Sequence, residues 1–129
     1  MSQRIPSLFI APSTIHHRGV YTAEAIDAGN VIEICPVIVL SPQDRKLIHK
    51  SKLHDYYFTW GEKDDGCAIA LGFGSIYNHS YQPNARFWVD LEMETISVHT
   101  IQAIEAGGEI LFNYNGDPKN MDELWFTKK

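Results

Sequence analysis

Short apolar runs rich in β-branched residues alternate with turn residues along most of the chain. Such runs, bounded by Gly, Pro, Asn and Asp, are typical of β-strands. In the longest run, residues 31–40, the β-branched side chains favour a pleated, half-buried strand. Pro36 cannot donate a hydrogen bond to a sheet ladder, so we expect this strand to bend or split there. The other predicted strands cover residues 8–12, 19–22, 56–60, 67–71, 85–90, 95–100 and 110–112.

One stretch in the first half of the chain carries helical signals instead. Ser41 can cap a helix, Pro42 suits the first helical position, and Asp44 favours the positive end of the helix. We predict that this helix runs to about residue 50 or 51. A second short helix is predicted over residues 120–126. Many short strands with a single helical insert indicate a mainly β domain.

Residues 72–84 are the least regular stretch, yet they are rich in polar and aromatic side chains. Gly72 and Gly74 open the stretch, Pro83 and Asn84 close it, and neither a strand nor a helical period runs through it. An Asn-His-Ser triplet lies in its middle. Loops that are more than polar connectors tend to carry function. The alternative is an Asx-type turn that only shapes the loop.

Composition narrows the class of protein. A chain of 129 residues with 44% apolar residues predicts one globular domain, residues 1–129. It contains neither an apolar run long enough to span a membrane nor a signal-peptide pattern, so we expect a cytoplasmic protein with no membrane partner. The net charge of −5 disfavours direct nucleic-acid binding and suits a lysine-rich partner. The two cysteines, Cys35 and Cys67, show no metal-ligand or disulfide spacing, so we expect two buried thiols and no metal site.

Three motifs occur in order along the chain. Residues 78–84 read Asn-His-Ser-Tyr-Gln-Pro-Asn, and residues 107–114 read Gly-Gly-Glu-Ile-Leu-Phe-Asn-Tyr. Near the start, residues 18–29 combine Arg-Gly-Val-Tyr with a later Ala-Ile-x-Ala-Gly. Together they resemble the central, closing and opening signatures of the SET domain, a family of S-adenosylmethionine-dependent protein-lysine methyltransferases. The resemblance covers residues 6–116 and leaves residues 117–129 as a C-terminal segment.

The resemblance implies a fold that periodicity could not give. SET domains, of the β-clip type, consist of several small curved sheets with a knot-like crossing. In that crossing the C-terminal segment threads beside the Asn-His-Ser loop. Ordinary topology rules would reject such threading. The resemblance also implies the cofactor S-adenosylmethionine and a lysine-containing protein or peptide as substrate.

Methyl transfer from a sulfonium to a lysine amine needs a neutral, aligned amine more than a strong base. A free lysine has a pKa of about 10.4, which a nearby sulfonium and a dry channel both lower. A tyrosine ring forms an apolar wall that tolerates cations, and its hydroxyl can orient the amine. Tyr114 matches the family tyrosine that lines the methyl-transfer channel. Its alternative interpretation is a core tyrosine at the end of a strand.

Other matched positions point to the cofactor. Asn78 and His79 match residues that bind its amino-acid part and adenine, and the Arg-Gly-Val motif matches backbone that reaches its methionine part. Trp125 could stack on adenine or close the site, although packing of the last helix explains it equally well. Tyr56, Tyr57, Tyr77 and Tyr81 could add aromatic walls, although core packing explains most of them better. The candidate cofactor-binding residues are therefore Arg18, Gly19, Val20, Asn78, His79 and Trp125.

The chain departs from the family pattern at several positions. His17 stands where the first motif usually has glycine, Ser75 where members often have arginine, and Tyr81 where they often have cysteine. Residues 33–37 replace a Glu-Tyr-x-Gly-Glu segment, so a second channel tyrosine is missing. Residues 117–129 or a second copy of the chain must complete the lysine channel, which makes a homodimer plausible. The departures motivate an alternative function, a weak or inactive SET-fold module that binds a basic peptide or partner protein.

Overall fold

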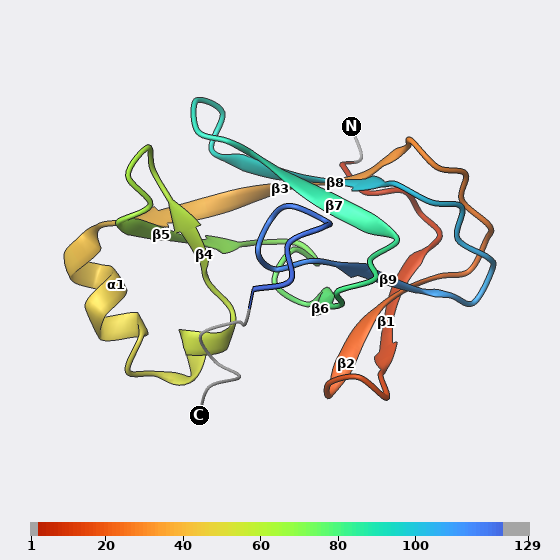
Figure 1. Cartoon of the computed structure of the whole chain (residues 1–129), viewed down its shortest axis with the longest axis horizontal. Coiled ribbons are helices and arrows are strands. Elements are labelled where there is room, and N and C mark those ends of the chain that lie inside the picture. Colours follow the sequence, from red (N-terminus) through yellow and green to blue (C-terminus); the bar gives the residue numbers. More distant parts are fainter. Residues whose placement is uncertain (1–2, 123–129) are drawn as a thin grey trace.

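The computed structural model describes residues 3–122, in which nine strands, one α-helix and one 3-10 helix form a mainly β fold (Figure 1). The predicted bounds are confirmed for the strands β1, β3, β7 and β8. The two-residue strand β6 was not predicted. The elements are β1 (Leu8–Pro12), β2 (Arg18–Thr22), β3 (Val31–Leu40), α1 (Pro42–Ile48), η1 (Lys52–Asp55), β4 (Phe58–Trp60), β5 (Gly66–Ala70), β6 (Asn78–His79), β7 (Ala85–Asp90), β8 (Thr95–Thr100) and β9 (Glu109–Phe112).

The strands form two sheets, one with the order β1-β2-β9-β6 and one with the order β4-β5-β3-β8-β7. The long strand β3 joins the two halves of the second sheet. Residues 31–36 of β3 pair with β8, and residues 37–40 pair with β5. Pro36 therefore lies where the strand changes partners, and β3 continues through it as one strand. This position suits a residue without a backbone N–H.

Buried side chains form two apolar clusters. The larger includes Val20, Tyr77, Ile110 and Phe112. It therefore joins β2, β9 and residues 72–84, which are called the central loop. The smaller surrounds Cys35 in the second sheet. Both cysteines are buried and unbonded, as expected. Burial raises the pKa of both thiols, and the Glu33 carboxylate raises that of Cys35 further.

The helical insert begins as predicted and ends earlier. Ser41 caps α1 by accepting a hydrogen bond from the Asp44 N–H at 3.1 Å. The α-helix ends at Ile48, because Ser51 begins a 3-10 turn by accepting from the Leu53 N–H at 3.1 Å. Tyr56 caps that turn, which delays the start of β4 to Phe58. Within residues 3–122, no helix has the length and apolar character needed to cross a bilayer.

The C-terminal part of the fold lies against the central loop. β6 pairs in parallel with β9, so that Asn78 lies opposite Leu111 and His79 opposite Phe112. Asn84 fixes the end of the loop, since its side chain donates to the Glu109 carbonyl at 2.9 Å and accepts from the Leu111 N–H at 2.8 Å. The proximity expected from the SET resemblance is therefore present. Of the predicted helix over 120–126, only residues 120–122 are described, and they are not helical.

A buried carboxylate holds the start of the central loop. Glu33 is only 2% exposed, and its Oε1 accepts from the Tyr77 hydroxyl at 2.7 Å. Its Oε2 accepts from the Phe73 N–H at 3.0 Å and forms an ion pair with Arg4 at 3.3 Å. The Arg4 guanidinium also lies 3.7 Å from the centre of the Phe73 ring. Glu33 thus connects β3 to residues 73–77, and Tyr77 is a core residue as predicted.

Candidate functional site

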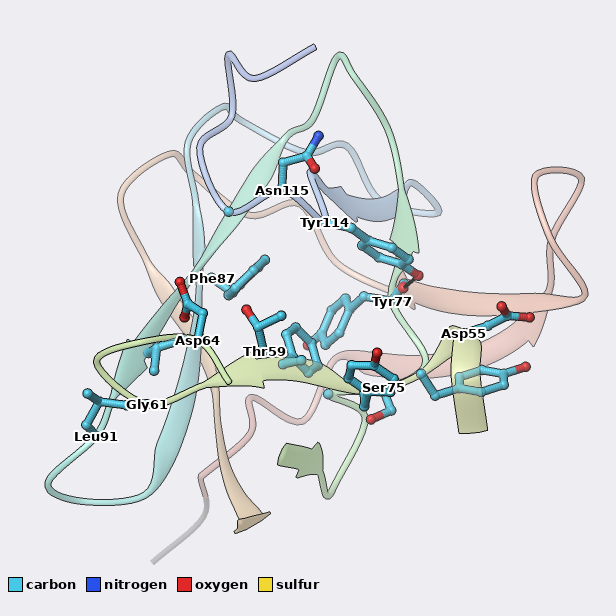
Figure 2. Close-up of a pocket in the computed structure, with 16 residues that line it drawn as sticks. Asp55, Thr59, Gly61, Asp64, Ser75, Tyr77, Phe87, Leu91, Tyr114 and Asn115 are labelled. Carbon is cyan, nitrogen blue, oxygen red and sulfur yellow. Dashed lines mark hydrogen bonds between the residues drawn. The ribbon is translucent and has the colours of Figure 1, made fainter. Parts of the chain in front are cut away.

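Two cavities meet at Tyr114. The first cavity has a volume of about 550 Å³ and is lined by the β1–β2 turn, η1, the central loop and Tyr114. The second cavity has a volume of about 400 Å³ and is lined by residues 55–59, the central loop, β7 and residues 114–116 (Figure 2). Both volumes suit small-molecule or side-chain binding sites. Four residues line both cavities and so form the boundary at which the cavities adjoin, here termed the passage: Asp55, Tyr56, Ser75 and Tyr114.

Tyr114 follows β9, and hydrogen bonds hold both its backbone N–H and its side-chain hydroxyl. Its hydroxyl donates to the backbone carbonyl of Tyr77, and its N–H donates to His79 Nδ1 at 3.0 Å. Burial raises the pKa of Tyr114 above its usual value, and the nearby Tyr56 and Asp55 raise it further. The phenol is therefore neutral at physiological pH. Because its proton is committed to Tyr77, the lone pairs of its oxygen remain able to accept a hydrogen bond.

His79 lines the first cavity behind Tyr114. Since its Nδ1 accepts from Tyr114, the neutral ring carries its proton on Nε2. That nitrogen is buried and has no hydrogen-bond partner among residues 3–122. A buried donor without a partner is unfavourable unless a ligand or water satisfies it. Because this nitrogen is fully buried, a ligand in the first cavity would contact it only if the His79 ring or its neighbours moved.

Burial lowers the pKa of His79 below its usual value. The folded protein thus disfavours the imidazolium that the unfolded chain forms below about pH 6.5. We expect the stability contributed by neutral His79 to be complete above that pH and to be lost as the pH falls toward the lowered pKa. Urea unfolding at pH 7.5 and pH 5.5 would measure the loss, and His79→Gln should lose less. Equal losses in both proteins would contradict the prediction, because His99, whose pKa is also lowered, is present in both.

Asn78 ties the central loop to the β1–β2 turn. It is 4% exposed, and its Nδ2 donates to the carbonyls of His16 and Arg18 at 3.2 and 3.1 Å. The same nitrogen donates to Glu109 Oε2 at 2.8 Å. The structure therefore brings together Arg18, Asn78, His79 and Tyr114 from three separate motifs, and all four line the first cavity.

The remaining predicted cofactor residues lie elsewhere. Val20 is fully buried in the core, and neither Gly19 nor Val20 is among the residues that line the two cavities. Gly19 instead provides space, since a Cβ there would lie 2.1 Å from Glu109 Oε2 and 2.9 Å from Asn78 Nδ2. Trp125 lies outside the described residues, so its role stays a prediction.

Gly19→Ala is expected to weaken binding of S-adenosylmethionine about tenfold, because the added methyl group must displace Glu109 or Asn78. Titration calorimetry would measure the affinity. Gly29→Ala is the control: its added Cβ has no neighbour within 4 Å, although its φ of 84° makes the substitution strained. The control should lose stability and keep its affinity. A Gly19→Ala protein with unchanged affinity would refute the prediction.

His17, where the family motif usually has glycine, adopts a φ of 44°. This left-handed conformation favours glycine, and a histidine there carries a strain of about 1 kcal/mol. The turn therefore keeps the backbone conformation that glycine would adopt easily. The departure at this position changes the side chain in the first cavity more than the path of the backbone.

Three residues at the passage were not predicted as site residues. Asp55 was not singled out, Tyr56 was one of four tyrosines that could add aromatic walls but were mostly better explained by core packing, and Ser75 was considered only as a departure from the family pattern. Ser75 donates to the Ala70 carbonyl at 2.9 Å while it lines both cavities. The only sequence signal was a pair of tyrosines directly after the helical insert. Placing Tyr56 at the site requires knowing that the insert folds back over the central loop.

The second cavity has a largely aromatic and apolar lining. Tyr57, Phe58, Tyr77 and Phe87 contribute rings, and Val89 and Leu91 extend the lining along β7. Figure 2 shows Gly61 and Asp64, from the turn between β4 and β5, near Leu91 at one end of this cavity. The turn is held to α1, since Arg45 donates to the Asp64 carbonyl at 2.6 Å. Such a lining suits a long alkyl chain that ends in an amine.

Comparisons with known proteins agree on one family. The SET domain model matches residues 17–115. A histone-lysine N-methyltransferase of Schizosaccharomyces pombe, specific for lysine 37 of histone H3, is 34% identical over 110 residues, which span 84% of this chain and 69% of that protein. A crystal structure of a candidate histone methyltransferase from Plasmodium falciparum has a TM-score of 0.66 and 25% identity, with 93% of this chain and 96% of that chain covered.

A more distant structure supports the fold alone. A humanized mutant of the Chaetomium thermophilum Polycomb Repressive Complex 2, bound to an inhibitor, has a TM-score of 0.70 at 19% identity and covers 88% of this chain and 15% of that chain. The matched region includes all three motifs and every element from β2 to β9. The chain belongs to the SET domain family, and its function class is that of a protein-lysine N-methyltransferase.

Proposed function

We propose that this protein transfers a methyl group from S-adenosylmethionine in the first cavity to a lysine amine that enters through the second cavity. The observation that carries this proposal is the shared passage. Two cavities built from different elements meet at Tyr56, Ser75 and Tyr114. A cofactor and a substrate that approach from opposite sides would bring their reacting atoms together there. In-line transfer requires this kind of arrangement.

The first cavity has features that fit the cofactor. Its volume of about 550 Å³ lies within the usual range for ligand sites. Apolar side chains of Ile15, Leu53 and Ile76 line it beside the polar groups of Asn78 and His79. The buried Nε2 of His79 would find an acceptor in the cofactor only if the ring moved on binding. When bound, S-adenosylmethionine supplies a methyl group activated by its sulfonium.

The residues of the passage would prepare the amine. The aromatic rings of the second cavity would hold the alkyl chain of lysine, and the desolvation they cause would lower the pKa of the amine. The Asp55 carboxylate, which lines both cavities, would attract the charged amine and so act in the opposite direction. The Tyr114 oxygen can accept a hydrogen bond from this amine, because its own proton is donated to Tyr77. The amine lone pair would then point toward the first cavity. Tyr56 lies where it can supply the second tyrosine that β3 lacks.

A histone H3 tail is the proposed first substrate to test. The relative from Schizosaccharomyces pombe is named as specific for lysine 37 of histone H3. The net charge of −5 also suits a basic tail, because long-range attraction between opposite charges speeds association. Weaker methylation at high ionic strength would be consistent with this attraction.

Titration calorimetry with S-adenosylmethionine and S-adenosylhomocysteine would test the proposal, followed by a labelled-methyl assay on recombinant histone H3. We expect micromolar binding that Asn78→Ala weakens, and label incorporated into lysine. Failure of both ligands to bind at millimolar concentration would refute the methyltransferase proposal and favour the non-catalytic module. Cofactor binding with label on other lysine-containing proteins in a lysate, and none on histone H3, would refute only the proposed substrate.

We also propose that the protein is cytoplasmic and forms a homodimer, two predictions made from sequence. The second copy would complete the lysine channel, as the alternative to the C-terminal segment. Sedimentation velocity would measure the oligomeric state, and imaging of a tagged full-length chain would measure the location. A monomer at micromolar concentration would contradict the predicted homodimer. Nuclear accumulation would contradict the predicted cytoplasmic location.

A further inference from the structure

Glu109, at the start of β9, connects three segments of the chain. Its Oε1 accepts from the Ser13 hydroxyl at 2.9 Å, and its Oε2 accepts from Asn78 Nδ2 at 2.8 Å. Its backbone carbonyl accepts from Asn84 Nδ2 at 2.9 Å. Gly19 leaves the space that the carboxylate occupies, because a Cβ there would lie 2.1 Å from Oε2. The carboxylate is therefore enclosed between the β1–β2 hairpin and the central loop.

The surroundings of Asn78 determine which way its side-chain amide points. Three oxygen atoms lie within 3.2 Å of its Nδ2: Glu109 Oε2 and the backbone carbonyls of His16 and Arg18. An ionised carboxylate and a carbonyl can only accept hydrogen bonds. If the amide were reversed, its own carbonyl oxygen would face these three acceptors without a hydrogen atom between them. The amide is therefore held with its NH₂ group toward Glu109.

This orientation has a consequence for the other end of the amide. Asn78 lines the first cavity, and no donor within residues 3–122 forms a hydrogen bond to its Oδ1. The carbonyl oxygen is thus available to a ligand as an acceptor. An ammonium group is a donor only, and hydrogen bonds from charged donors are stronger than neutral ones. The free acceptor matches the ammonium of an amino acid.

We propose that Glu109 is a positioning residue for the cofactor. By accepting from Asn78 Nδ2, it keeps Asn78 Oδ1 directed into the first cavity, where that oxygen binds the ammonium of the methionine part of the cofactor. This inference rests on the proposed function, since it requires S-adenosylmethionine to occupy the first cavity. The role of Glu109 means that the protein's affinity for the amino-acid part of the cofactor depends on a residue that does not line the first cavity.

The variant Glu109→Gln tests this role with little change in shape. The glutamine amide can donate to Asn78 Oδ1, which removes the charged acceptor that holds the amide and populates the reversed orientation, while the carbonyls of His16 and Arg18 still favour the original one. We expect the affinity for S-adenosylhomocysteine, measured by titration calorimetry, to fall about tenfold. The affinity for 5′-methylthioadenosine should stay within about twofold, because that compound has the nucleoside and lacks the amino-acid part. A general loss of structure would weaken both ligands alike.

Ser13→Ala is the matched control. It removes the other hydrogen bond of the same carboxylate, together with the bond that Ser13 Oγ accepts from the Ile15 N–H at 3.0 Å, and leaves the contact with Asn78 intact. Its affinity for S-adenosylhomocysteine should remain within about threefold of wild type. A double-mutant cycle gives the decisive comparison: in an Asn78→Ala background, Glu109→Gln should cause no further loss.

The outcomes separate this inference from the proposed function. Wild-type protein that binds S-adenosylhomocysteine, together with Glu109→Gln protein of equal affinity, would overturn the role of Glu109 alone. Equal weakening of both ligands by Glu109→Gln, or a full further loss in the Asn78→Ala background, would also overturn it. Wild-type protein that binds neither ligand would overturn the proposed function and with it this inference.

Discussion

Tyr114→Phe is expected to lower kcat for methyl transfer at least 100-fold while it leaves the Kd for S-adenosylhomocysteine within about twofold. The substitution keeps the ring that separates the two cavities and removes the oxygen that would orient the amine. It also removes the hydrogen bond to the Tyr77 carbonyl, which costs about 1 kcal/mol of stability. A selective loss of kcat would therefore indicate that the hydroxyl acts on the substrate.

Tyr21→Phe is the matched control for this experiment. The Tyr21 hydroxyl also donates to a backbone carbonyl, that of Pro12 at 2.8 Å, but it lies in the β1–β2 hairpin and lines neither cavity. The control should lose a similar amount of stability and keep its kcat. Methylation rates would be measured at saturating cofactor with histone H3. A Tyr114→Phe enzyme with wild-type kcat would remove Tyr114 from its assigned role.

Glu33→Ala is expected to lower the free energy of unfolding by about 3 kcal/mol, the largest loss of stability that we predict. The substitution leaves the hydroxyl of Tyr77 and the N–H of Phe73 without their acceptor in the core. Most of the loss arises from these two unsatisfied donors. The ion pair with Arg4 contributes less, because the Arg4 side chain is 39% exposed and screened by water.

Urea unfolding of Glu33→Ala, Glu33→Gln and Glu105→Ala would measure the effect. Glu33→Gln should lose less than the alanine variant, since its amide oxygen can still accept one of the two hydrogen bonds. Glu105 is exposed in a turn, so its substitution should stay within about 0.5 kcal/mol of wild type. A loss below about 1 kcal/mol for Glu33→Ala would show that the loop does not depend on this carboxylate.

The sequence was most informative where local chemistry decides structure. The strands at 8–12, 31–40, 85–90 and 95–100 have the predicted bounds, because β-branched runs and flanking turn residues specify them locally. The cap at Ser41 was likewise predicted from a side chain and a backbone N–H three residues apart. Local signals failed for β6, whose two residues are a strand only because β9 lies beside them.

The sequence alone determined the family, the approximate secondary structure and four of the fourteen residues that line the first cavity. It did so because Arg18, Asn78, His79 and Tyr114 lie in motifs that are contiguous in the chain. Only the tertiary structure decided that Tyr56 and Ser75 lie at the passage, and that Gly19 and Glu109 lie beside Asn78 without lining either cavity. These roles depend on contacts between segments that are tens of residues apart, such as the hydrogen bond from Asn78 to Glu109. Such contacts form only in the folded tertiary structure, so no local pattern in the sequence predicts them.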